Sequence, residues 1–489
     1  MTVSGRYFGA MRFFPALFTA VWLGFIVHGA ENTPSNASTP RATREQEASL
    51  KWYQARLTDA YHKVGKRDAK WDSPVESALF LVAEGLAEVP TSDPKWREMA
   101  VELADSAIRE GCTDPLVRFT ARRYRGQSKR STRKSADVAA EWVALAGDMS
   151  SSGYAPNWKF HAELEAAAAL RSAMPQGTNT WPEIHQHRHA AMAHLVAALG
   201  DKTTPRAELT EMVTAERNLV RSNPKQLAAA WAEIEPLLRK NWPKLALADL
   251  IDGRMAITAA WKARGSGTID TVTEDGYRKF SEELEKARRL LTRAWENDKT
   301  DPSAPTEMLT VCMGLEKGAN EVETWFARAM DARPGHMPAI RAKIQNLAPK
   351  WGGSLQALYR FGRQCLKEES WGDEAPWGLV LVHDEMAAAL ADGAPGEEWR
   401  ASKRAYWRRP GVWKEVEEVV AVMKQRNPSA EADLDYRLVM HATRCAMWSE
   451  VAKVAPKLSP EYRKRVSGTN SFDAVLAEVK ALAAKEAKP

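Results

Sequence analysis

The chain has 489 residues, of which 44% are hydrophobic and 27% are charged, as in an ordinary folded protein. One hydrophobic core rarely spans so many residues, so an elongated or modular body is expected. The formal net charge of +6 is too small to indicate nucleic-acid binding, and we predict no nucleic-acid partner.

The N-terminus has the pattern of a secretory signal peptide. Arg6 and Arg12 precede an apolar run over residues 13–27, which small residues follow. The run contains Pro15 and is shorter than the roughly 20 apolar residues that span a bilayer, so we prefer export to a membrane anchor. We therefore predict a cleaved signal peptide at residues 1–30 and a periplasmic or secreted protein.

Helical periodicity dominates the chain after a short polar segment. Residues 31–48 are rich in Thr, Pro, Ser and Asn and are expected to form a disordered tether. Strand signals are nearly absent beyond it, so we predict an all-α fold, with irregular helical hairpins over residues 49–224. The expected helices cover residues 75–89, 94–110, 137–148, 156–173, 182–199, 205–221 and 226–240, with Asp93–Pro94 and Asp114–Pro115 at two helix starts.

A basic run without an acid lies within this first part. It consists of Arg118, Arg122, Arg123, Arg125, Lys129, Arg130, Arg133 and Lys134. A run of this kind is usually a solvated, mobile connection between helices, which is the interpretation we prefer. The alternative is a binding site for an anionic envelope polymer or for lipid head groups.

Four histidines form the densest group of potential metal ligands: His185, His187, His189 and His194. His185 and His189 would share a helix face, which is a ligand spacing that zinc sites use. A third and a fourth ligand are missing, because Glu183 is not on that face and His194 is turned away from it. We therefore predict a solvated helix face, and no metal and no cofactor.

The strongest pattern returns at a spacing of 35 residues. Leu291, Phe326 and Phe361 occupy one position of this repeat, and Leu309, Ile344 and Leu379 occupy another. A period of about 34 residues with two helices per unit is typical of tetratricopeptide-like (TPR-like) hairpins, which stack into an α-solenoid with a binding surface. We predict such an α-solenoid over residues 225–390.

The same segment resembles an uncharacterised bacterial family of TPR-like domains, over residues 225–370. The resemblance depends on a Trp-x-Ala-Arg-Gly-x-Gly pattern, a later Gly-aromatic step and a final Pro-x-Trp-Gly-Gly pattern. These patterns are carried by Trp261, Ala263, Arg264, Gly265, Gly267, Val272, Thr273, Gly276, Tyr277, Pro349, Trp351, Gly352 and Gly353. The resemblance implies a TPR-like fold and no known activity, cofactor or catalytic residue.

The long, glycine-rich connection between Trp261 and Gly276 is the first candidate for a functional segment. Long loops in compact domains are often functional, and Arg264 could bind a carboxylate or phosphate there. The alternative, which we prefer, is that Arg264 hydrogen-bonds the open carbonyls at its own helix end. Arg264, Tyr277 and Trp351 are our candidate partner-binding residues.

The last part, residues 391–489, is expected to form helical hairpins and a terminal cap, with helices at 412–424, 429–447 and 474–487. Five tryptophans precede or open it, for which we expect packing rather than sugar or peptide stacking: Trp371, Trp377, Trp399, Trp407 and Trp413. The four cysteines are widely spaced and are interpreted as buried free thiols: Cys112, Cys312, Cys365 and Cys445.

Two functional classes remain open. The chain contains none of the common hydrolase, metalloprotease, P-loop or dinucleotide-binding motifs. We therefore predict an exported protein that binds an unidentified protein or peptide partner of the cell envelope, or acts as an envelope scaffold, and that is not an enzyme. The alternative is an enzyme that acts on an envelope polysaccharide or peptidoglycan, which would need a catalytic Glu in a protected cleft.

Overall fold

The computed structural model describes residues 42–125, 134–174, 182–220, 224–267, 271–468 and 471–486, and these are helical, with no strand among them. The predicted all-α class is confirmed. The predicted signal peptide lies outside the described residues. No helix in the described ranges is both long and apolar enough to cross a bilayer.

The chain divides into two compact units between Leu245 and Ala246. Near the expected boundary at 224/225, helix α10 (Pro224–Asn241) packs against two helices that precede it, α8 (Pro182–Gly200) and α9 (Arg206–Val220). Near the expected boundary at 390/391, α17 (Trp377–Leu390) packs on the helices that follow it. The expected division into domains stays a prediction. Each unit is described separately below.

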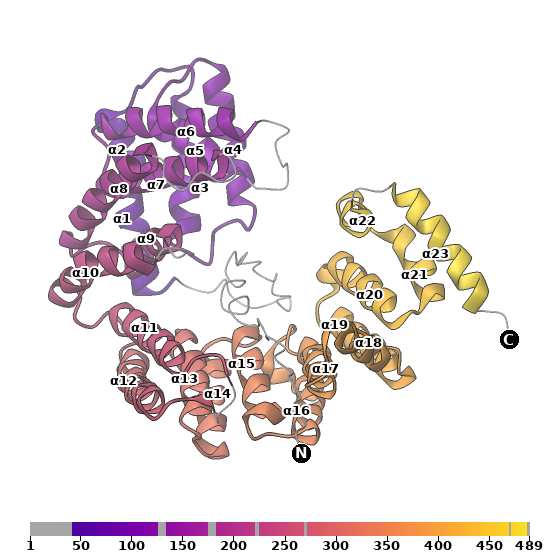
Figure 1. Cartoon of the computed structure of the whole chain (residues 1–489). Helices are drawn as coiled ribbons and strands as arrows, with labels where there is room; N and C mark the ends of the chain where they lie inside the picture. The colour runs from indigo at the N-terminus through magenta and orange to yellow at the C-terminus, as the bar shows by residue number, and fades with distance from the viewer. Residues whose placement is uncertain are drawn as a thin grey trace, which may run out of the picture. The chain divides into compact units, whose positions relative to one another are not determined.

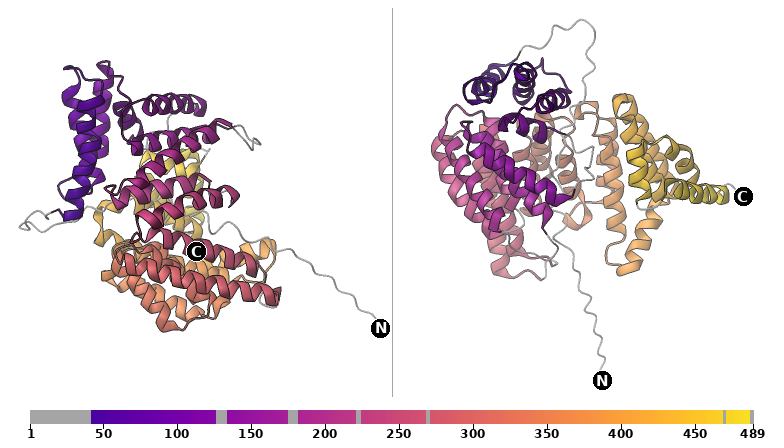
Figure 2. Two further views of the ribbon diagram at one scale, coloured as in Figure 1. Left: turned by 90° about the vertical axis from the view of Figure 1, so that its left-hand side faces the viewer. Right: turned by 90° about the horizontal axis from the view of Figure 1, so that it is seen from above.

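The N-terminal unit consists of helices that pack mainly on their neighbours in sequence (Figures 1 and 2). Its remaining helices are α1 (Arg44–Arg56), α2 (Thr58–Val64), α3 (Asp72–Leu86), α4 (Trp96–Arg109), α5 (Pro115–Arg123), α6 (Ser135–Ser150) and α7 (Pro156–Ala173).

Local capping sets the first boundaries of this unit. α1 begins at Arg44, inside the segment that we expected to be a tether, because Thr43 and Gln46 form a reciprocal capping box. Asp114 caps α5 as predicted, since its carboxylate accepts from the backbone N–H groups of Leu116 and Val117. α4 begins later than expected, at Trp96.

The C-terminal unit contains the predicted repeats and the helices after them (Figure 1). Its helices are α11 (Leu247–Arg264), α12 (Glu274–Asn297), α13 (Ser303–Gly314), α14 (Ala319–Ala332), α15 (Met337–Leu347), η2 (Pro349–Trp351), α16 (Leu355–Lys367), η3 (Glu369–Trp371), α17, α18 (Gly396–Trp407), α19 (Pro410–Arg426), η4 (Pro428–Ala430), α20 (Glu431–Cys445), α21 (Trp448–Val454), η5 (Ala455–Lys457), α22 (Pro460–Ser467) and α23 (Phe472–Glu486). From α11 to α17, each odd-numbered helix contacts the next odd-numbered helix as well as the even-numbered helix between them.

The 35-residue spacing marks the core of this unit. Leu291, Phe326 and Phe361 lie on α12, α14 and α16 and are at most 3% exposed. The second set, on α13, α15 and α17, is equally buried: Leu309, Ile344 and Leu379. The predicted register therefore corresponds to equivalent buried positions in successive helix pairs.

The cysteines and two of the clustered tryptophans are core residues, as expected. All four cysteines are free and buried. Trp407 and Trp413 are buried in the core formed by α17 to α21. Trp371 packs against the rings of Phe326 and Phe361, with centroid distances of 5.0 Å and 6.0 Å.

Candidate functional site

The three predicted binding residues lie in one region of the C-terminal unit, around the ring of Trp261. Trp261 is in the last turn of α11, and the Trp351 ring lies edge-on to it at a centroid distance of 5.3 Å. The Phe280 ring packs against Trp261 at 5.0 Å and also lies 6.5 Å from the ring of Tyr277. We call the surface formed by Trp261, Arg264, Tyr277 and Trp351 the Trp261 face.

Arg264 lies at the centre of the Trp261 face. Its guanidinium carbon is 5.7 Å from the ring centroids of both Trp261 and Trp351, a distance at which cation–π attraction acts. Its Nη1 donates to the backbone oxygens of Gly265 and Gly267, at 3.4 Å and 3.1 Å. These carbonyls lie just beyond the helix, so the geometry is close to the preferred interpretation, in which Arg264 closes its own helix end. Nε and Nη2 donate to no group of the described chain, so part of the guanidinium fork is still free.

Tyr277 is the exposed member of the face. Its side chain is 51% exposed, although it lies next to buried Phe280 on the first turns of α12. Trp261, Arg264 and Trp351 are partly exposed. Exposed and partly exposed aromatic rings and an arginine are residue types that protein interfaces favour.

Two glycines, one from the Gly-aromatic step and one from the Pro-x-Trp-Gly-Gly pattern, position the Trp261 face. A Cβ on Gly276 would lie 2.8 Å from the carbonyl oxygen of Ala263, so only glycine lets α12 approach the end of α11 this closely. Gly352 has a φ of +83°, in the left-handed region, which ends η2 directly after Trp351. Thr273 caps α12, because its side chain accepts from the backbone N–H of Gly276.

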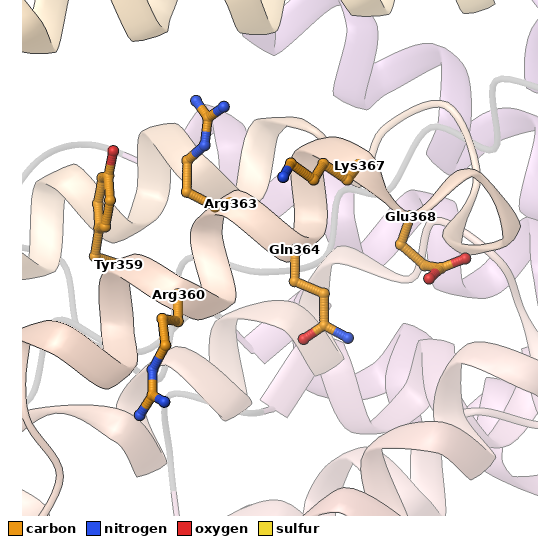
Figure 3. A pocket seen from close by; sticks show the side chains of 6 residues that line it. All are labelled: Tyr359, Arg360, Arg363, Gln364, Lys367 and Glu368. Atoms are coloured by element: carbon orange, nitrogen blue, oxygen red, sulfur yellow. The ribbon is translucent and has the colours of Figure 1, made fainter.

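A shallow hollow on α16 is a weaker candidate. It is lined by Tyr359, Arg360, Arg363, Gln364, Lys367 and Glu368. Figure 3 shows Tyr359 and Arg363 pointing to one side of the helix and Arg360 and Gln364 to the other, so the polar groups do not converge. Arg363 is also already paired, with its Nη1 2.7 Å from a carboxylate oxygen of Glu418.

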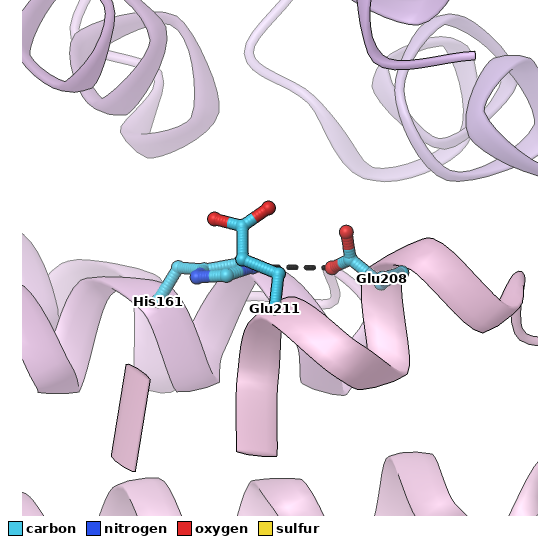
Figure 4. A group of neighbouring side chains, drawn as sticks. All are labelled: His161, Glu208 and Glu211. Carbon is cyan, nitrogen blue, oxygen red and sulfur yellow. Dashed lines mark hydrogen bonds and ion pairs between the residues drawn. The ribbon is translucent and has the colours of Figure 1, made fainter. Parts of the chain in front are cut away.

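The N-terminal unit contains a buried polar network around Glu208, which is 1% exposed. Tyr53 Oη donates to Oε2 of Glu208 at 2.9 Å, and Asn157 Nδ2 donates to Oε1 at 3.2 Å. His161 Nε2 lies 3.1 Å from the same Oε1 (Figure 4). Burial alone would raise the pKa of Glu208, but the hydrogen bonds from His161, Tyr53 and Asn157 hold it below the ordinary value.

Arg123 connects this network to two more carboxylates. Its Nη1 is 2.7 Å from Glu165, and its Nη2 is 2.5 Å from Glu211. Figure 4 shows Glu211 beside His161 and Glu208, where the three side chains of α7 and α9 meet. The members of this group are far apart in the chain and match no motif, so the sequence alone does not reveal the group.

The predicted basic run is largely neutralised where it is described. Besides Arg123, each arginine of the run within residues 118–125 is within 4 Å of an acid: Arg118 with Asp148, Arg122 with Glu141, and Arg125 with Asp105. These acids come from other helices, so the absence of acids inside the run did not mean free positive charge. Lys129, Arg130 and Arg133 lie outside the described residues, and the anionic-polymer hypothesis stays a prediction.

The histidine group divides into two pairs. His185 and His189 are exposed, as predicted for a solvated face. His187 instead lies 2.5 Å from Glu163 of α7 through its Nδ1. Burial lowers the pKa of His194, although the nearby Glu163 carboxylate counteracts this effect. The expectation of a wholly solvated face was therefore wrong for His187 and His194, because it could not include an acid from a neighbouring helix.

Comparison of the chain with protein-family models and with curated proteins gave no match.

Proposed function

We propose that this is an exported helical-repeat protein, with an α-solenoid of TPR-like hairpins in its C-terminal unit, that binds a protein or peptide partner through the Trp261 face. The equivalent buried positions on α12 to α17 and the packing of alternate helices support the solenoid. Stacked hairpins of this kind offer continuous surfaces for peptide recognition. The resemblance to the uncharacterised TPR-like family belongs to the same proposal.

The observation that carries the proposal is the cluster of Arg264 and Trp351 around Trp261, to which exposed Tyr277 is joined through the ring of Phe280. The partner would place a carboxylate against Nε and Nη2 of Arg264, because a guanidinium binds a carboxylate in a bidentate manner. An apolar side chain of the same partner would cover the rings of Tyr277 and Trp351. Buried aromatic and arginine anchors of this type usually dominate interface energies.

The proposal is tested by capturing envelope proteins from the producing cells with the purified chain. We compare the wild type with Tyr277→Ala and Arg264→Lys, because lysine keeps the charge and loses the planar fork. Phe80→Ala is the matched control, since Phe80 is also an exposed aromatic residue, at 45%, but lies in the N-terminal unit. The proposal would be supported by a partner that binds the wild type and the control equally well. The same partner should bind Tyr277→Ala and Arg264→Lys at least about tenfold more weakly. Equal capture by all four proteins would contradict it.

A further inference from the structure

His161, Glu208 and Glu211 present one nitrogen and two carboxylate oxygens that all lie within 4.8 Å of one another. Ligand atoms held in a tetrahedron by one zinc ion at about 2.0–2.2 Å lie about 3.3–3.6 Å apart. The separation of 3.1 Å between His161 Nε2 and Glu208 Oε1 is only slightly shorter than this spacing. His161 and Glu208 are at most 2% exposed, whereas Glu211 reaches solvent.

The charges around this group are not balanced. Glu165, Glu208 and Glu211 bring three carboxylates together, and Arg123 is the guanidinium that pairs with two of them. Glu208 is left with Tyr53, Asn157 and His161, none of which carries a permanent positive charge. A buried carboxylate with no cation in direct contact is expensive, so an additional cation beside Glu208 would stabilise the group.

Asn157 provides the second observation. The residue is 2% exposed, and its side-chain oxygen Oδ1 is buried without a hydrogen-bond partner in the described part of the chain. Its amide faces Glu208 Oε1 through Nδ2, at 3.2 Å. The two orientations of an amide differ by the exchange of oxygen and nitrogen. Turning the amide over would place Oδ1 beside Glu208 Oε1, an arrangement that a cation between the two oxygens would stabilise.

We propose that His161, Glu208 and Glu211 bind a divalent transition-metal ion, with Zn²⁺ as the first choice, and that Asn157 Oδ1 is a further ligand. Imidazole together with carboxylates suits zinc better than calcium or magnesium, which prefer oxygen ligands alone. The ion would join α7, which carries Asn157 and His161, to α9, which carries Glu208 and Glu211. This site departs from the prediction of no metal made from the sequence.

Neighbouring side chains hold two of these ligands in place. Arg123 Nη2 donates a hydrogen bond to Oε1 of Glu211, so Oε2 of Glu211 is available to an ion. Tyr53 holds Oε2 of Glu208 and leaves Oε1 directed at His161. Groups that orient the ligands in this way are a regular part of metal sites. Nδ1 of His161 has no partner in the described chain, so no other group fixes the tautomer of its ring.

The test uses the full chain stripped of metal, titrated with zinc chloride against a coloured competing chelator. We expect about one tightly bound ion per chain. Glu211→Gln and His161→Gln should each weaken zinc binding at least about tenfold. Loss of a group that only orients a metal ligand already weakens binding by about this factor, and these variants remove the ligands themselves. Glu211 is 45% exposed, so its variant should fold even if the buried variants do not, and circular dichroism checks this.

The matched control is the double variant His185→Gln/His189→Gln. It removes two exposed histidines whose spacing on a helix also suits zinc. The control should bind zinc as tightly as the wild type, and zinc should raise the melting temperature of both but not of Glu211→Gln. Zinc binding that survives Glu211→Gln and disappears in the control would show an adventitious surface ion and overturn the proposal. Absence of binding in the wild type would overturn the proposal too.

Discussion

The ring of Trp351 lies edge-on to the ring of Trp261 at a centroid distance of 5.3 Å. Trp261 is in the last turn of α11, whereas Trp351 lies in η2, directly after α15, and α13 packs against both α11 and α15. The contact therefore joins two elements that α12 to α15 separate in the chain. It also brings together residues from two separate sequence patterns, with the guanidinium of Arg264 close to both rings.

Trp351→Ala should lower the stability of the C-terminal unit by about 2 kcal/mol. Loss of a buried tryptophan costs about 3–5 kcal/mol, and Trp351 is only partly buried. Urea unfolding monitored by circular dichroism measures the change. Tyr277→Ala is the control, because an exposed side chain should change stability by no more than about 0.5 kcal/mol. Equal stabilities of the two variants would show that the Trp261–Trp351 contact contributes nothing.

Gly276→Ala should destabilise the protein by about 1–3 kcal/mol, because the new methyl group would overlap the carbonyl oxygen of Ala263. Gly147→Ala is the opposite case. Gly147 lies inside α6, and a Cβ added there would meet no neighbouring side chain within 4 Å, so alanine should stabilise by about 0.5–1 kcal/mol. Denaturation midpoints measure both effects, and a stabilising Gly276→Ala would disprove the close packing of α11 and α12.

Lys343→Met should leave stability within about 1 kcal/mol of the wild type, whereas Lys343→Ala should lower it by about 2–4 kcal/mol. The Lys343 side chain is 2% exposed, and its Nζ lies 4.2 Å and 4.5 Å from the ring centroids of Phe326 and Phe361. Methionine fills this space without a charge, while its former partner Glu323 is still solvated. Calorimetric melting tests the pair of variants. A large loss in Lys343→Met would mean that the ammonium itself stabilises the core.

His336 should make the protein less stable at acidic pH. Burial, assisted by the nearby Arg333, lowers the pKa of His336 to about 4, from an ordinary value of 6.5. Between these values the unfolded chain binds a proton that the folded chain does not, so stability falls as the pH is lowered through this range. When the pH is lowered from 7 to 4.5, we expect the free energy of unfolding of His336→Gln to fall by about 2 kcal/mol less than that of the wild type. Urea midpoints of both proteins from pH 7 to 4.5 measure it, and parallel curves would contradict the assignment.

Local signals allowed much of the fold to be predicted. The helix expected at residues 156–173 matches α7, and Asp114 caps α5 as its position before a proline indicated. The repeat correctly placed Leu291, Phe326 and Phe361 in the core. These predictions succeeded because a cap or a periodic apolar face depends on residues close together in the chain.

Contacts between distant helices could not be predicted in the same way. The acids that pair with Arg118 and Arg125 come from other helices, as does Glu163, which faces His187. His161 and Glu208 belong to separate helices and match no motif. Arg264, Tyr277 and Trp351 were found because they belong to recognisable patterns. Only the structure shows that Arg264 and Trp351 lie against Trp261 and that Phe280 lies between Trp261 and Tyr277.

Photo-crosslinking from position 277 tests the binding surface most directly. A photoreactive phenylalanine analogue replaces Tyr277 in one protein and Phe80 in another, and both are irradiated in the envelope fraction of the producing cells. The Trp261 face predicts a discrete crosslinked product from position 277 that is absent from position 80 and lost when Arg264→Lys is added. Identical crosslinking from the two positions, or a product that persists with Arg264→Lys, would contradict a partner site on this face.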